Sequence, residues 1–229
     1  MNYVVVGAGA VGCYLGGRLV AAGHSVTFIG RPKVLTTLRQ HGLTITDLDG
    51  FHAHLPGDQL QLADHLDANH FAHACTVLLC VKGGATRSAA QELAAVCPAH
   101  TTVISMQNGV ENADRIRTEP PALAVVAGMV PFNVVLLPDG QVHRGTTGAL
   151  TMARQPATRR DSRRHPTRRT AAACDSSRRG LSEPCRTCRE PSGSPGDWRA
   201  RELFCVLARL TGDPFFPFFP TIPIPARRQ

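Results

Sequence analysis

The glycine motif near the start of the chain constrains the fold more than any other feature of the sequence. A short apolar run at Tyr3–Val6 leads into GAGAVG at residues 7–12, a GxGxxG pattern, and a helix-like run follows at Val11–Ala22. A second apolar run, Val26–Ile29, comes after a Gly-His break. The pattern is weak alone, but its place between a predicted strand and a predicted helix indicates a βαβ unit that binds a dinucleotide. A glycine-rich turn in another kind of α/β protein is the competing interpretation.

Each glycine of the motif has a physical task in such a unit. Gly7 permits the tight turn, Gly9 lets a pyrophosphate approach the backbone, and Gly12 allows the helix to pack closely on the strand. The helix N-terminus offers free N–H groups and a partial positive charge to the phosphates. We therefore predict a cofactor-binding segment that consists of Gly7, Ala8, Gly9, Ala10, Val11 and Gly12.

Arg31 indicates which dinucleotide binds. In NAD-binding units an acidic residue at the end of the second strand accepts hydrogen bonds from the ribose 2′-OH, whereas this chain has Gly30-Arg31 at that place. A guanidinium cannot accept those bonds, but it pairs well with a 2′-phosphate, a contact worth about 1.5–3 kcal/mol. The sequence therefore predicts NADP(H) rather than NAD(H) as the cofactor. A solvent-facing Arg in a loop is the alternative.

Two further apolar runs end in polar residues that suit a ligand site. Thr76–Val81 precedes Lys82, and Thr101–Met106 comes shortly before Asn108. Continuous apolar runs suit buried parallel strands, whose carboxyl ends form the ligand-binding edge of an open α/β sheet. We expect Lys82 and Asn108 to face the cofactor and the substrate, although a solvated Lys and a simple Asn-Gly turn would have the same sequence.

The remaining pattern completes the predicted fold class, which is α/β, a Rossmann-like doubly wound parallel sheet. Apolar runs alternate with helix-like segments, as expected for βαβ units. Helices are predicted at residues 34–41 and 85–96, and further strands at residues 43–45, 122–127, 134–137, 142–143 and near 152.

Charge divides the chain into two parts. Residues 1–153 hold nine Lys+Arg and ten Asp+Glu, a net charge of −1, whereas residues 154–229 hold sixteen Arg, no Lys and seven Asp+Glu, a net charge of +9. The two values sum to the +8 of the whole chain. We expect a dinucleotide-binding domain at 1–153 and an irregular, poorly ordered Arg/Pro-rich basic tail at 154–229.

Metal and membrane sites are not expected. Residues 51–74 are rich in His but have no Cys or carboxylate partner at a recognisable ligand spacing, so we interpret these residues as surface or half-buried histidines. No stretch reaches the eighteen or more apolar residues of a membrane span. The first apolar run leads into the glycine turn and does not have the form of a signal peptide. A reducing cytoplasm is therefore the expected location, where disulfides are not expected.

Taken in order, the motifs resemble one known family. The segments are VVGAGAVGCYLGGRL, the strand-end Gly-Arg, VK at 81–82, QNGV at 107–110, GMVPFNVV at 128–135 and HRGTTGAL at 143–150. Over about residues 1–153 this series is similar to the N-terminal half of ketopantoate reductase (2-dehydropantoate 2-reductase). The resemblance implies an NADPH-binding Rossmann domain and reduction of 2-dehydropantoate, a small 2-keto acid, to (R)-pantoate in pantothenate biosynthesis.

The resemblance also implies roles for individual residues. Residues 7–12 would hold the pyrophosphate and Arg31 the 2′-phosphate. Lys82 and Asn108 would face the cofactor and the substrate, and the backbone near Val134 would contact the cofactor. The oligomeric state is not predicted.

The family's helical second domain has no recognisable counterpart in this sequence. In the family that domain supplies a catalytic Lys and a substrate-binding Glu, but this chain has no Lys after Lys82, so its catalytic residues stay unknown. Three interpretations of residues 154–229 are open: a nucleic-acid-binding tail, a zinc site at Cys185 and Cys188, or the product of a frame change in the gene. We favour the frame change and expect a chain that binds NADPH but turns over poorly. A non-catalytic NADP(H)-binding protein with a nucleic-acid-binding tail, or a reductase of another 2-keto acid, is the alternative.

Overall fold

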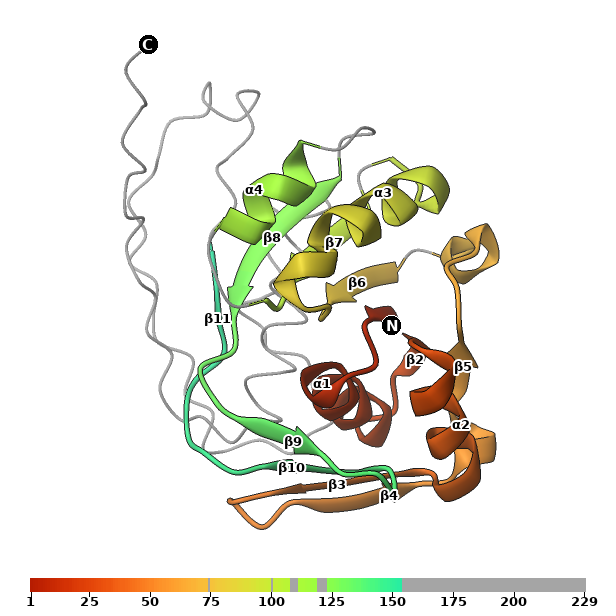
Figure 1. Cartoon of the computed structure of the whole chain (residues 1–229), viewed down its shortest axis with the longest axis vertical. Helices are drawn as coiled ribbons and strands as arrows, with labels where there is room; N and C mark the ends of the chain where they lie inside the picture. Colours follow the sequence, from red (N-terminus) through yellow and green to blue (C-terminus); the bar gives the residue numbers. More distant parts are fainter. Residues whose placement is uncertain (74, 100, 108–110, 119–122, 154–229) are drawn as a thin grey trace, which may run out of the picture.

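The structure is a computed structural model that describes residues 1–153 except 74, 100, 108–110 and 119–122. Asn108 and the predicted tail at 154–229 therefore lie outside the described residues. Four α-helices and two sheets make up the described part (Figure 1). The α-helices are α1 (Ala10–Ala21), α2 (Pro32–His41), α3 (Thr86–Val96) and α4 (Glu111–Arg117).

The main sheet has the strand order β11-β8-β7-β6-β1-β2-β5. Its described neighbours pair in parallel, except that β11 is antiparallel to β8. The central β1 lies between β2 and β6, so the chain winds outward from it in both directions and confirms the predicted Rossmann-like α/β class. The strands are β1 (Asn2–Val6), β2 (Ser25–Ile29), β5 (Gln61–Ala63), β6 (Cys75–Leu79), β7 (Thr102–Ser105), β8 (Ala124–Met129) and β11 (Thr151–Met152).

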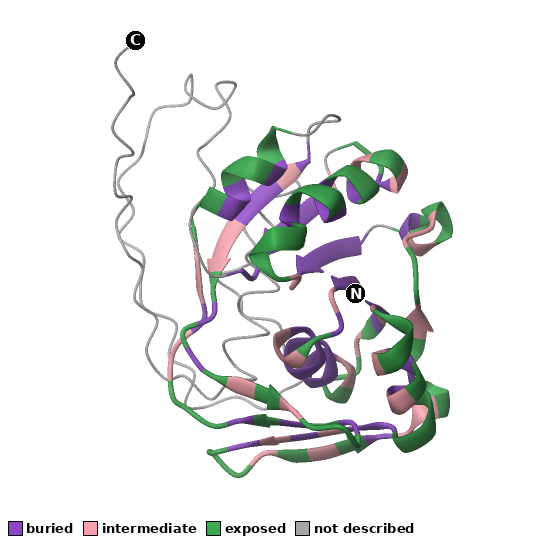
Figure 2. Cartoon of the chain, in the orientation of Figure 1, coloured by how far each residue is buried: buried purple, intermediate pink, exposed green. Residues whose placement is uncertain are grey.

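The two faces of the main sheet bury separate apolar cores. Tyr3 and Val5 of β1 belong to the core that includes α1, whereas Val4 and Val6 belong to the core that includes α3 and α4. This alternation follows from the two-residue repeat of a strand. Because both faces are covered, β6 and β7 are buried at every position, and Figure 2 shows β6 buried along its length.

A second, smaller sheet covers α1 on the side away from the main sheet (Figure 1). Its order is β4-β3-β10-β9, with β3 and β10 parallel and the outer pairs antiparallel. A Cβ on Gly17 of α1 would lie 2.7 Å from the side chain of Ile45, so the glycine allows the helix to approach this sheet closely. The strands are β3 (Leu43–Asp47), β4 (His52–Leu55), β9 (Val134–Leu136) and β10 (Gln141–Arg144).

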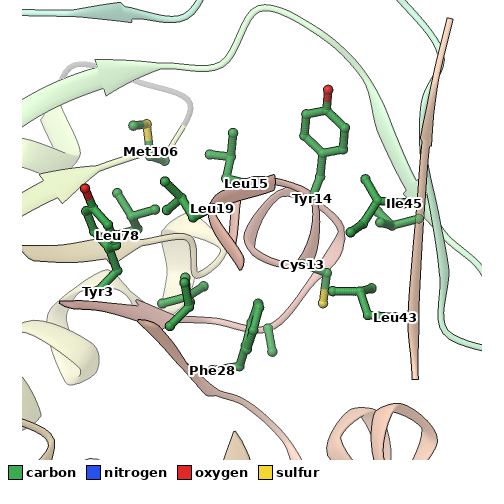
Figure 3. Packing of buried hydrophobic residues seen from close by; sticks show 14 of the residues in the cluster. Tyr3, Cys13, Tyr14, Leu15, Leu19, Phe28, Leu43, Ile45, Leu78 and Met106 are labelled. Atoms are coloured by element: carbon green, nitrogen blue, oxygen red, sulfur yellow. The ribbon is translucent and has the colours of Figure 1, made fainter. Parts of the chain in front are cut away.

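Helix α1 therefore lies between two sheets and is buried on most of its circumference. Figure 3 shows Leu15 and Leu19 on the side of Leu78 and Met106, and Cys13 on the side of Leu43. This double coverage was not predicted, because the sequence indicated one parallel sheet only. It explains why the helix is apolar nearly all round, as expected for a fully buried helix.

A buried ion-pair network joins α1 to the second sheet. An Asp47 carboxylate oxygen accepts from Arg18 Nη1 at 2.6 Å and from the Tyr14 hydroxyl at 3.2 Å, and Arg144 Nη2 lies 3.7 Å from the same oxygen. The other Asp47 oxygen accepts the backbone N–H groups of Asp49 and Phe51 at 3.0 Å each. Burial raises the pKa of Tyr14 to about 12, so its phenol stays a hydrogen-bond donor.

The two buried guanidinium groups of this network also contact aromatic rings. Arg18 Cζ lies 3.6 Å from the centroid of the Phe51 ring, and Arg144 Cζ lies 5.5 Å from that of Phe132. Arg144 also pairs with the half-exposed Asp49 carboxylate. Among the described residues, the buried Nε atoms of both arginines have no hydrogen-bond partner. Burial lowers the pKa of Arg18, which is the expected direction for a desolvated cation.

Candidate functional site

The glycine turn has the geometry that the sequence predicted. Gly7 has φ +104°, and a Cβ there would lie 2.8 Å from the backbone of Cys80 and Val81, so only glycine fits. A Cβ on Gly12 would collide with the Gly7 carbonyl oxygen. Gly9 differs, because a Cβ there would have no atom of the described residues within 4 Å. The turn therefore packs tightly at its two ends and faces open space at its middle glycine.

The first backbone N–H groups of α1 follow this open position. Gly9 is the N-cap of α1 and has no side chain to cap the helix. The first helical hydrogen bond runs from Cys13 N–H to the Gly9 carbonyl at 2.8 Å, so the N–H groups of Ala10, Val11 and Gly12 come before the helical ladder begins. Such donors, together with the helix dipole, favour an anion at this position.

The end of β2 is bonded directly to the glycine turn. The Ile29 carbonyl accepts the N–H groups of both Gly7 and Ala8 at 2.9 Å. A Cβ on Gly30 would lie 2.7 Å from the Ala8 Cβ, so glycine is needed for this approach. Arg31 follows as the N-cap of α2, and its side chain is exposed. Within the part of the chain that the structure describes, its guanidinium takes part in no ion pair or side-chain hydrogen bond, which leaves it available to a ligand.

A cavity of about 350 Å³ opens beside the turn, at the carboxyl ends of β6 and β7. The start of α1, the ends of these two strands and the β8–β9 connection form its walls. Lys82 is the one charged side chain among the described residues of its lining. The lining consists of Val11, Cys80, Val81, Lys82, Gly83, Met106, Gln107, Val130, Phe132, Asn133 and Val134.

The predicted site residues are placed in two groups. Val11, Lys82 and Val134 line the cavity, whereas the rest of the glycine turn and Arg31 lie outside its lining. Asn108 is outside the described residues, but Gln107, which precedes it, lines the same cavity. The structure thus brings together, at one edge of the sheet, segments that are far apart in the sequence.

The sequence-based reasoning did not single out a buried polar network behind the cavity. Gln107 Nε2 donates to the Val81 carbonyl and to Thr86 Oγ1, each at 2.8 Å, and its Oε1 accepts from Ser105 Oγ at 3.2 Å. Thr86 Oγ1 lies 2.9 Å from the Gly83 carbonyl. A buried Gln at the carboxyl end of a parallel strand was the available signal, because a buried amide needs partners.

The cavity contains a thiol but no metal cluster. Burial raises the pKa of Cys80 to about 12, and the neighbouring Cys13 adds to the shift, so this thiol stays protonated and is a poor nucleophile. The described residues include no group of three His, Cys, Asp or Glu side chains that could hold a metal ion. In the same part of the chain, no helix has the length and apolarity needed to cross a membrane.

Known proteins share this architecture. A relative called 2-dehydropantoate 2-reductase from Halobacterium salinarum is 30% identical over 155 residues, 67% of this chain and 49% of that protein. The Mycobacterium tuberculosis protein of the same name is 29% identical over 67% of this chain and 48% of its own length. The crystal structure of a PanE/ApbA family ketopantoate reductase from Ralstonia eutropha is 32% identical, covers 66% of this chain and 49% of that chain, and has a TM-score of 0.59.

These matches extend over the described part of the chain and stop near its end. The chain spans about half the length of the relatives it matches. The sequence profile of the ketopantoate reductase PanE/ApbA family matches residues 3–156, which include the glycine turn, the end of β2 and every segment that lines the cavity. The chain therefore belongs to the ketopantoate reductase PanE/ApbA family.

Proposed function

We propose that the chain binds NADP(H) along the carboxyl edge of the main sheet, from Arg31 to the cavity at Lys82. One observation carries the proposal: a glycine turn with open space at Gly9 lies between an exposed guanidinium and a 350 Å³ cavity. The residues fit the chemistry of the dinucleotide from end to end. A cation suits the 2′-phosphate, helix N–H donors suit the pyrophosphate, and a cavity with both apolar and polar lining residues suits the nicotinamide and its amide group.

The substrate would be a small 2-keto acid, and family membership favours 2-dehydropantoate. The nicotinamide would supply a hydride to the C2 carbonyl when bound. Lys82 would attract the substrate carboxylate and stabilise negative charge on the carbonyl oxygen. Asn108 would donate its side-chain amide to the cofactor or the substrate. Phe132 and Val134 would exclude water from one side of the nicotinamide.

We further propose that this chain binds NADPH but reduces the keto acid slowly or not at all. Reduction of a ketone needs a proton for the forming alkoxide, and the family uses a Lys for this step in its second half. This chain has no Lys after Lys82. Lys82 would then have to serve both as the anion-binding cation and as the proton donor.

Cofactor binding is tested by titration of the full chain with NADPH and with NADH, followed by fluorescence. We expect NADPH to bind more tightly by about ten- to a hundredfold, the worth of one charge-assisted contact. Gly9→Val should lower NADPH affinity by more than about tenfold because its side chain would occupy the space of the pyrophosphate. The matched control is Ala21→Val at the exposed end of the same helix. Equal affinity of Gly9→Val and wild type would contradict the proposed site.

Turnover is tested separately, by NADPH consumption with 2-dehydropantoate and with other 2-keto acids. A kcat in the usual range for an enzyme of about 1–1000 per second would overturn the proposal of impaired turnover. A faster reaction with another keto acid would identify that compound as the substrate instead.

A non-catalytic role is the second candidate, and the charge of residues 154–229 favours it. Sixteen Arg against seven acidic residues would attract nucleic acid phosphates. A salt-dependent gel shift by the full chain that is lost on removal of residues 154–229 would support this role. The absence of any shift at low salt would exclude it.

A further inference from the structure

The loop that carries Lys82 is held by hydrogen bonds from two buried side chains, Gln107 just after β7 and Thr86 at the start of α3. Gln107 and Thr86 have exposed fractions of 5% and 1%. The Gln107 amide nitrogen donates at 2.8 Å to the Val81 carbonyl, immediately before Lys82 in the chain, and at 2.8 Å to Thr86 Oγ1, on the far side of the loop. One side chain, two residues after the end of β7, thus bonds both ends of the segment 81–86.

Thr86 closes the loop on itself. Its hydroxyl accepts from Gln107, so its single proton is free to go to the Gly83 carbonyl at 2.9 Å, with Asn112 Oδ1 at 3.3 Å as the weaker alternative. Within the loop, Ala85 N–H donates to the Lys82 carbonyl at 2.8 Å. The backbone on either side of the Lys82 side chain is therefore fixed by hydrogen bonds from two buried side chains.

The orientation of the Gln107 amide follows from its partners. A backbone carbonyl can only accept, so the atom that faces Val81 must be the amide nitrogen. The amide oxygen then faces Ser105 Oγ, which donates to it at 3.2 Å. All hydrogen-bonding groups of the buried amide are used, and such complete networks are costly to disturb.

The network lies directly behind the polar wall of the cavity. Lys82, Gly83 and Gln107 all line the cavity, and Gln107 is adjacent to Asn108 in the chain. Lys82 itself is exposed and takes part in no side-chain hydrogen bond or ion pair in the described part of the chain. Its placement therefore depends on the loop backbone and, through that backbone, on Gln107 and Thr86.

We propose that Gln107 and Thr86 are positioning residues, which clamp the loop at Lys82 to the end of β7 and so fix the part of the site that receives the nicotinamide and the keto acid. The inference rests on the proposed NADP(H) function. It goes beyond it because neither side chain is expected to react with cofactor or substrate. Loss of the clamp should weaken binding of the nicotinamide at the cavity and leave binding of the 2′-phosphate at Arg31 unchanged.

The test compares Thr86→Val, which keeps the shape of the side chain but removes the hydroxyl, with Thr86→Ser, which keeps the hydroxyl. Full chains are titrated with NADPH and with adenosine 2′,5′-bisphosphate, which has the 2′-phosphate but no nicotinamide. We expect Thr86→Val to bind NADPH about tenfold more weakly, the effect of one net hydrogen bond, and the bisphosphate within about twofold of wild type. Thr86→Ser should bind both ligands as wild type does.

Two outcomes would overturn the inference. If Thr86→Val binds NADPH as tightly as wild type, the clamp does not position the cavity. If Thr86→Val and Thr86→Ser both lose affinity for NADPH and for the bisphosphate to the same extent, the effect is a general loss of structure. Gln107→Met, which removes both donors at a similar side-chain length, is measured in the same way in case Thr86→Val does not fold.

Hydrogen exchange separates a failure of the clamp from a failure of the proposed function. Peptides that cover residues 82–86 should exchange about tenfold faster in Thr86→Val than in wild type, and those of β1 at the same rate. Unchanged exchange at 82–86 would refute the clamp even if NADPH binds. Wild-type chain that does not bind NADPH would refute the proposed function, and the positioning role with it, whatever the exchange rates are.

Discussion

Replacing Asp47 with Asn should destabilise the chain by about 3–5 kcal/mol, the cost of breaking a buried ion pair from one side. The carboxylate and the Arg18 guanidinium are 2.6 Å apart, with side chains 2% and 7% exposed. At an effective dielectric constant of about 20, this distance gives a gross attraction of about 6 kcal/mol, part of which offsets the desolvation of the two ions. Asn keeps an oxygen for the backbone N–H groups of Asp49 and Phe51, but its amide nitrogen replaces the oxygen that accepts from Arg18 and Tyr14. The change therefore removes the charge together with these two hydrogen bonds.

The assay is urea unfolding of the full chain, with thermal unfolding alongside. At about 2–4 °C per kcal/mol for a protein of this size, the melting temperature should fall by roughly 6–20 °C. Arg18→Met combined with Asp47→Asn should cost less than the sum of the single changes by about 1–3 kcal/mol, because the unpaired guanidinium is then absent. Glu111→Gln, which breaks the exposed pair with Arg115, is the control and should cost under about 0.5 kcal/mol.

The result that would refute this reasoning is a small effect at the buried site. If Asp47→Asn and Glu111→Gln change the free energy of unfolding by the same amount, the network does not hold the second sheet on α1. Additive single changes in the double variant would also contradict direct coupling between Arg18 and Asp47.

Three further outcomes are expected. Arg31→Ala should weaken NADPH binding by about ten- to a hundredfold and leave NADH binding unchanged. The control is Arg39→Ala, which removes the same charge later in α2 and should change neither affinity. Titration of each variant with the two cofactors measures these affinities. Gly12→Ala should lower the free energy of unfolding, measured in urea, by more than about 3 kcal/mol, because its Cβ would collide with the Gly7 carbonyl. A loss under about 1 kcal/mol would contradict the close approach of α1 to β1. The thiols of Cys13, Cys80 and Cys97 should make the free energy of unfolding depend on pH. Burial raises their pKa to about 12, whereas in the unfolded chain they ionise near 9.0, so the free energy of unfolding should fall by about 1.4 kcal/mol for each thiol between pH 8 and pH 10. Unfolding curves at the two pH values would show no such loss if the thiols were accessible to solvent.

The first βαβ unit was predictable because its signals are local. The apolar run before Gly7 forms β1, the run after Gly9 forms α1, and Arg31 follows β2, as the spacing indicated. The position of Lys82 at the carboxyl edge of the sheet was also predictable from the sequence, because the carboxyl ends of parallel strands meet at one edge. The assignment of Arg31, Lys82 and Val134 to a cofactor stays a prediction.

The second sheet and the buried charges were not predictable in this way. Strand β4 has His52 and His54 on its exposed face, and it was interpreted only as part of a His-rich segment with surface or half-buried histidines. Its neighbour β3 pairs with β10, which is far away in the sequence, and no local pattern encodes that pairing. Arg18 was interpreted only as part of an apolar helix, and Arg144 only as part of a family motif. A buried arginine has no sequence signature, because its partners come from other elements.

The pairing of β3 with β10 also determines when the chain can fold. Thr44 lies opposite Gln141, so the part of α1 that β9 and β10 cover stays exposed during synthesis until β10 has left the ribosome. At about 5–20 residues per second, the interval between the appearance of β3 and that of β10 is roughly 5–20 s. During this time the apolar side of α1 and an open edge of β3 are available to chaperones or to other nascent chains. A nascent chain halted before residue 141 should therefore be sensitive to protease, and one extended past β11 should be resistant.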